Sequence, residues 1–70
     1  QKLTFPDLEV GDHFAIASQV NLDGKASYHR IKVSDTHFTW FNSKTNEHGF
    51  TSVSNARPEV VLLDSKSNVI

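Results

Sequence analysis

Turn-forming residues recur about every ten residues along this chain, and the segments between them are rich in aromatic and β-branched residues. This spacing is typical of the short strands of a sandwich or barrel. No internal repeat, low-complexity tract or Gly/Ser linker divides the 70 residues. The sequence therefore predicts one all-β domain over residues 1–70, a small five-stranded antiparallel barrel or strongly bent sheet.

The segment from Phe5 to Phe14 leads the chain into its first long strand. Pro6 fixes one backbone angle, Asp7 can cap a turn, and the pair Gly11-Asp12 supplies a bend. Turn formers interrupt the apolar residues here too often for a strong strand, so we expect a short helical turn or an irregular lead-in. Its apolar side chains have two possible places, either plugging one end of the barrel or covering the outer face of the sheet.

Five strands are expected from the apolar segments. They are His13 to Val20, Ser27 to Val33, His37 to Asn42, a strand from Gly49 that includes Thr51 and Val53, and Glu59 to Leu63. The last segment is continuously apolar, which predicts that it is covered on both sides or closes a barrel. A break is expected at Asn55 to Pro58, and Val69-Ile70 could dock again after a polar stretch.

The first hairpin carries the pair Asp23-Gly24, which favours a tight two-residue loop. With this loop, Ile16 lies opposite Ile31 and Phe14 lies opposite Val33. Local turn chemistry and hydrophobic alternation then agree on one buried face.

The second hairpin is expected to turn at Asp35-Thr36 in the same way. That register places Phe38 opposite Val33 and Trp40 opposite Ile31, which extends the buried face.

Pairing Asn42 with Gly49 would add Thr51 and Val53 to the buried face and point Phe50 outward beside Phe41. The outer face then carries the candidate binding residues Tyr28, Arg30, Lys32, Phe41 and Phe50. Bases could stack on such rings while the cations bind phosphate, which predicts a nucleic-acid surface. The alternatives are a protein partner, bound by the same patch or by an exposed strand edge, and a second small core in which the lead-in covers Phe41 and Phe50.

Charge and composition limit the partners. The net charge of −1 predicts little nonspecific attraction to a polyanion, so any nucleic-acid site must be a local patch. The absence of cysteine excludes disulfides and thiolate metal sites. No apolar run approaches the ~20 residues of a membrane span, so the sequence predicts a soluble protein.

No catalytic or metal motif is present. The four histidines, His13, His29, His37 and His48, lack metal-ligand spacing. There is no serine elbow and no phosphate-binding glycine loop, and a barrel this small has little room for a cleft of ~300 Å³. We therefore expect a binding module that is not an enzyme and that needs no cofactor or metal.

Three segments carry a resemblance: the opening Phe5-x-Asp7-Leu8-x-Val10-Gly11-Asp12-x-Phe14, the strand from Tyr28 to Val33, and the turn Ser34-Asp35-Thr36. Together they resemble a recurring type of small phage-encoded accessory protein. This resemblance implies a small barrel that acts, without enzymatic activity, on host or phage macromolecules in the host cytoplasm. The chain is also similar to the SH3-like barrels of translation and transcription factors, in which Val-Gly-Asp often opens a strand.

Overall fold

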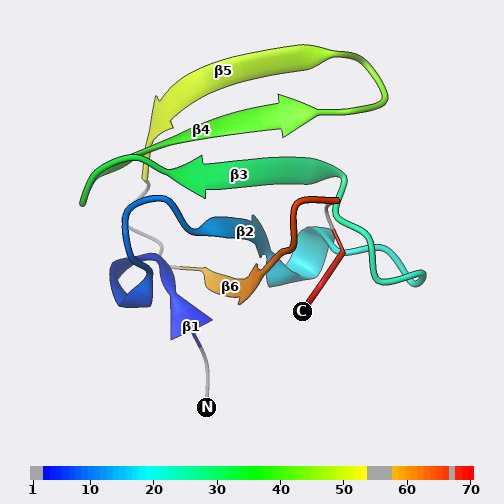
Figure 1. Ribbon diagram of the computed structural model, residues 1–70, viewed down its shortest axis with the longest axis horizontal. Coiled ribbons are helices and arrows are strands. Elements are labelled where there is room, and N and C mark those ends of the chain that lie inside the picture. The colour runs from blue at the N-terminus through cyan, green and yellow to red at the C-terminus, as the bar shows by residue number, and fades with distance from the viewer. Residues whose placement is uncertain (1–2, 54–57, 67) are drawn as a thin grey trace.

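The computed structural model describes residues 3–53, 58–66 and 68–70 (Figure 1). Its strands are β1 (Leu3–Thr4), β2 (His13–Ile16), β3 (Tyr28–Lys32), β4 (His37–Asn42), β5 (Glu47–Ser52) and β6 (Glu59–Leu62), and its two 3-10 turns are η1 (Phe5–Asp7) and η2 (Ala17–Gln19).

The described strands form one antiparallel sheet in the order β1-β6-β2-β3-β4-β5. The expected all-β class is confirmed. Six strands pair where five were predicted, and β1 and β5 lie at the two edges of an open sheet (Figure 1). Among the described residues, no helix is long and apolar enough to cross a membrane.

The lead-in contains the expected helical turn, η1. Asp7 fixes it by accepting hydrogen bonds from the backbone N–H and the hydroxyl of Thr4 at 2.9 and 3.1 Å. These bonds, the backbone one first, lower the pKa of Asp7 because they stabilise the carboxylate. Strand β1 was not predicted. It is only two residues long, too short for alternation to reveal, and it forms because the edge of β6 pairs with it.

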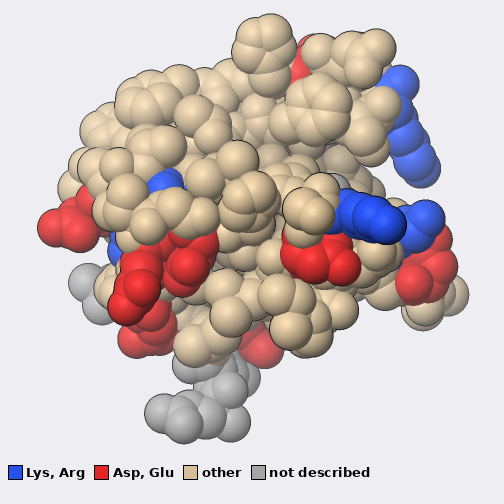
Figure 2. All heavy atoms as spheres, in the orientation of Figure 1, with Lys and Arg blue, Asp and Glu red and all other residues tan. Residues whose placement is uncertain are grey.

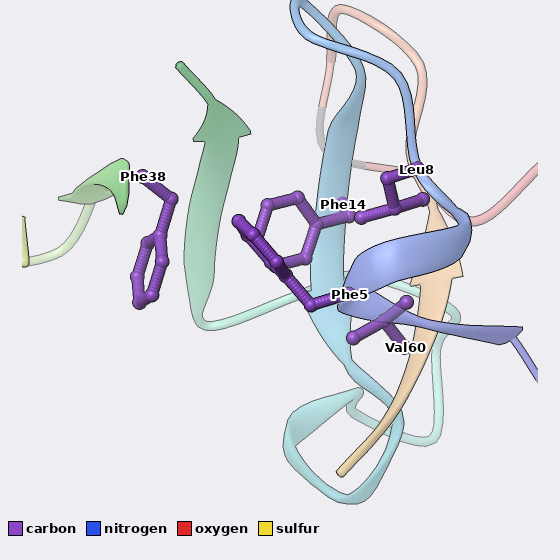
Figure 3. Close-up of a cluster of buried hydrophobic side chains, with 5 residues drawn as sticks. All are labelled: Phe5, Leu8, Phe14, Phe38 and Val60. Carbon is purple, nitrogen blue, oxygen red and sulfur yellow. The ribbon is translucent and has the colours of Figure 1, made fainter. Parts of the chain in front are cut away.

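The core lies on one face of the sheet and is built around three phenylalanines. Phe5, Phe14 and Phe38 meet at centroid distances of 5.6 to 5.9 Å, two of the three pairs edge to face, and Leu8 and Val60 complete the buried cluster (Figure 3). Phe5 and Leu8 therefore pack into this core. The alternative in which the lead-in covers Phe41 and Phe50 is wrong, since those rings stay 42% and 63% exposed.

Lys32 holds the lead-in against the sheet. Its side chain is only 3% exposed, and Nζ donates hydrogen bonds to the carbonyl oxygens of Phe5 at 3.1 Å and Leu8 at 2.6 Å. Nζ also lies 4.7 Å from the centre of the Phe5 ring. The ammonium group is thus paired with backbone carbonyls, which offsets the cost of burying it.

The first hairpin does not have the predicted register. Gly24 has a φ of +81°, its N–H donates to Asn21 O, and Asn21 N donates to Lys25 O, which makes a three-residue loop rather than a two-residue one. Turn η2 then takes up further residues of the expected first strand, which ends at Ile16. Phe14 consequently lies opposite Arg30 instead of Val33.

The second hairpin slips by one residue for a similar reason. Val33 and Ser34 both donate to the carbonyl of His37, so Ser34-Asp35-Thr36 forms the loop. Trp40 then lies opposite Arg30 instead of Ile31, and Lys32 faces Phe38. Because side chains alternate along a strand, a one-residue slip exchanges the two faces of β3 relative to β4.

The pairing of β4 with β5 slips by two residues, which leaves the faces unchanged. Phe41 lies opposite His48 and Thr39 lies opposite Phe50, so Phe41 and Phe50 share a face as predicted. At the other end of the chain, the bridge between Leu63 and Val69 confirms that the C-terminal segment docks again. Residues 54–57 of the predicted break lie outside the described residues.

Candidate functional site

Two rows of side chains cross β3, β4 and β5 on the face turned away from the phenylalanine core. One row is His29, Phe41 and His48. The next row is Ile31, Thr39 and Phe50. Each member lies directly opposite its neighbour on the adjoining strand, so the rows form one continuous surface.

These six residues line a groove of about 610 Å³, together with Trp40, Gly49 and Ser65, the last of which lies in the turn after β6. The groove exceeds the ~300 Å³ for which a small barrel was expected to have little room, because an open sheet leaves this face uncovered. None of the described residues that line it is Lys, Arg, Asp or Glu. Aromatic, imidazole and aliphatic groups therefore dominate the surface.

The edge of the groove is set by Phe50. The ring of His37 stacks on it at a centroid distance of 5.0 Å and an angle of 11°, and His37 Nδ1 lies 2.8 Å from the hydroxyl of Thr36. This stack holds Phe50 in place at the outer strand although the side chain is mostly exposed.

The other three predicted binding residues lie on the opposite face. Tyr28 packs edge to face against Trp40 at 5.8 Å, and Lys32 is buried. The five candidates Tyr28, Arg30, Lys32, Phe41 and Phe50 therefore do not form one surface. The predicted platform of rings flanked by cations is wrong because the register of β3 against β4 differs by one residue.

Arg30 is held by neighbours on the core face. Its Nη2 donates to Gln19 Oε1 at 2.9 Å, and its guanidinium lies over the rings of Tyr28 and Phe38 at 5.5 and 5.2 Å. Burial lowers the pKa of Arg30 from its ordinary value. Its buried Nε has no hydrogen-bond partner within the described part of the chain. This cation serves the packing of the sheet and is not presented to a ligand beside Phe41.

Beside the groove, the structure brings together two histidines that the sequence analysis left apart. His13 Nδ1 and His29 Nε2 lie within hydrogen-bond distance, with the rings edge to face. Such a contact requires a proton on one nitrogen and none on the other. Burial first, and His13 second, lowers the pKa of His29, while Asp64 raises it. A correct register of β2 against β3 was the only signal that could have revealed this pair.

Several acidic groups lie over η1 and the loop that follows it, whereas most of the surface over β4 and β5 carries no charge (Figure 2). Asp64 is the acidic group beside the groove, where it precedes Ser65 and raises the pKa of His29. Within residues 3–53, 58–66 and 68–70, no three His, Cys, Asp or Glu side chains come together as a metal site.

Comparison with known proteins found no relative. No family model, curated protein or solved structure matches this chain. The resemblance to phage accessory proteins accordingly stays a prediction, and the geometry of the groove and of its neighbouring strand edge carries the functional argument.

Proposed function

We propose that this chain is a protein-binding module that captures an extended polypeptide segment by adding it as a strand to β5. Side chains of the captured strand would alternate, so that every second one enters the groove beside Phe41 and Phe50. The observation that carries this proposal is the adjacency of an uncharged aromatic groove and the outer edge of β5, on which the described residues place no strand.

The edge supplies affinity and the groove supplies selectivity. Strand β5 pairs with β4 along its whole length, from Asn42↔Glu47 to His37↔Ser52, and the described chain places no strand on its other side. An edge strand presents a row of backbone donors and acceptors that an incoming chain can bind. Phe50 and Phe41, exposed beside that row, offer apolar area at low entropic cost.

Binding of nucleic acid is less favoured, because the two cations expected beside the rings do not lie on the groove face. Binding a single strand requires a basic groove that follows the phosphates as well as rings for the bases. Lys32 is buried under the lead-in and Arg30 is packed against Phe38 on the other face. Because the described residues that line the groove offer rings but no Lys or Arg, they favour a polypeptide partner.

A titration followed by NMR tests the proposal. The probe is a synthetic strand peptide, Lys-Val-Thr-Phe-Thr-Val-Lys, and its control carries proline in place of phenylalanine, which cannot continue a strand ladder. We expect the largest amide shifts in residues 47–52 with the first peptide and none with the second. The variant Phe50→Lys should lose the response, whereas Leu22→Lys, in a fully exposed loop position, should keep it.

Oligothymidine serves as the competing probe in the same titration. If it shifts the groove residues with a steep dependence on salt while the strand peptide shifts none, the proposal is wrong and nucleic-acid binding replaces it.

We further propose that the fold is an opened form of the SH3-like barrel expected from the sequence. Its support is the connectivity: β2, β3, β4 and β5 follow one another as a meander, and β6 returns to lie beside β2. In such a fold the binding residues come from the sheet face and its loops, not from the buried core.

A further inference from the structure

We infer that the strand captured by β5 is the β5 strand of a second copy of this chain, so that two sheets join into one across a twofold axis. The inference rests on the proposed function and names its partner.

Strand β5 lacks three of the devices that keep natural edge strands apart. Its sequence, Glu47-His48-Gly49-Phe50-Thr51-Ser52, contains no lysine and no proline. Its pairing with β4 runs without a bulge. Lysine, proline and bulges are the usual means by which soluble proteins prevent edge-to-edge pairing, so an edge without them is free to pair.

The two faces of the sheet restrict the register of such a pair. In an antiparallel pair, two residues that lie directly opposite each other point to the same face of the sheet. If one residue of β5 lies opposite the same residue of the second copy, the twofold axis between them is perpendicular to the sheet, and the grooves of both copies lie on the same side. With Phe50 on the axis, the two Phe50 rings face each other, His48 faces Ser52, and Gly49 faces Thr51. The grooves of the two copies then become continuous.

Charges permit this arrangement. Glu47 is the only Lys, Arg, Asp or Glu in β5, and in this register it faces Val53 of the other copy, so no carboxylate meets another. The net charge of −1 per chain adds little repulsion between copies.

The size of the contact predicts a weak, reversible dimer. A six-residue strand is ~20 Å long and a sheet is ~10 Å thick, so the contact covers a few hundred Å². Stable dimers bury about 800 Å² per partner. Association should therefore depend on concentration and reverse on dilution.

Cysteine cross-linking tests the pairing and its register, because the chain contains no cysteine of its own. Under mild oxidation with diamide, Phe50→Cys should form a covalent dimer at least about tenfold faster than Leu22→Cys, since residues facing each other across strands have Cβ atoms ~5 Å apart. Thr51→Cys, which faces Gly49 of the other copy, should cross-link more slowly than Phe50→Cys. Equal rates for all three variants would overturn the inference.

Sedimentation of the unmodified chain provides the second measurement. Its mass should rise toward twice the monomer value near millimolar concentration, and Phe50→Lys should remain monomeric with an unchanged circular dichroism spectrum. A monomer at every concentration overturns the inference. If the strand peptide still shifts residues 47–52 in that case, the proposed function stands without it; if neither occurs, both fail.

Discussion

Trp40 lies directly opposite Gly49, and its indole ring covers the glycine. A Cβ atom added at Gly49 would lie 2.6 to 2.8 Å from Nε1, Cε2 and Cζ2 of that ring. The indole N–H also donates to the hydroxyl of Thr51 at 3.2 Å. The aromatic side chain is thus fixed between two residues of β5, and glycine is the residue that leaves room for it.

We expect Gly49→Ala to lower the free energy of unfolding by about 1–3 kcal/mol, because the added methyl group must displace a packed indole. Urea unfolding followed by fluorescence measures this directly, since Trp40 is the only tryptophan. In a Trp40→Leu background, followed by circular dichroism, the same substitution should cost much less. An equal cost in both backgrounds would mean that the indole does not lie over Gly49.

Lys32→Met tests the clamp on the lead-in. The variant keeps an unbranched side chain but removes the donor to the carbonyls of Phe5 and Leu8, so the free energy of unfolding should fall by about 1.5–3 kcal/mol. Lys44→Met is the matched control in an exposed turn and should stay within about 0.5 kcal/mol of the parent. Chemical denaturation of both variants decides the point, and an undiminished stability of Lys32→Met would contradict the buried contact.

Truncating the buried ring of Phe5 should lower the free energy of unfolding far more than truncating the exposed ring of Phe50. Phe5→Ala removes a buried ring at a cost of about 3–5 kcal/mol, comparable with the whole stability of a domain of this size, so the chain should be largely unfolded. Phe50→Ala truncates a ring that is 63% exposed and should cost less than about 1 kcal/mol. Amide dispersion in NMR spectra distinguishes the outcomes. Unfolding of both variants would support the second small core that the structure excludes.

His29 should make stability depend on pH. Burial and His13 lower its pKa in the folded state, while Asp64 opposes the shift, so the unfolded chain binds the proton more readily. The contribution of His29 to the free energy of unfolding is fully present above the ordinary histidine pKa of about 6.5. It is lost as the pH falls from there through the lower pKa of His29 in the folded state. Urea midpoints at neutral and mildly acidic pH should therefore differ more for the parent than for His29→Gln. An identical difference in both proteins would show that His29 is not the group responsible.

Much of the strand pattern was accessible from the sequence because alternation survives local errors. The predicted bounds of β4, His37 to Asn42, are those observed, and β3 differs by one residue at each end. Phe41 and Phe50 were placed together correctly although their strands slip by two residues, since an even slip preserves the faces.

The candidate site was harder to predict because it depends on whether two hairpin loops contain an odd or an even number of residues, which decides the face on which each side chain lies. A residue with positive φ at Gly24 and a third loop residue at Ser34 each change a register by an amount that composition does not reveal. Turn η2 adds extra residues to one side of the first hairpin. These changes moved Arg30 and Lys32 to the core face and placed His29 and Ile31 in the groove.

A nuclear Overhauser spectrum reports directly on which side chains share each face of the sheet. We expect contacts between the rings of His37 and Phe50 on one face and between Tyr28 and Trp40 on the other. Contacts from the Phe41 ring to the side chains of Arg30 or Lys32 would contradict this arrangement, because they would place rings and cations together on a single surface.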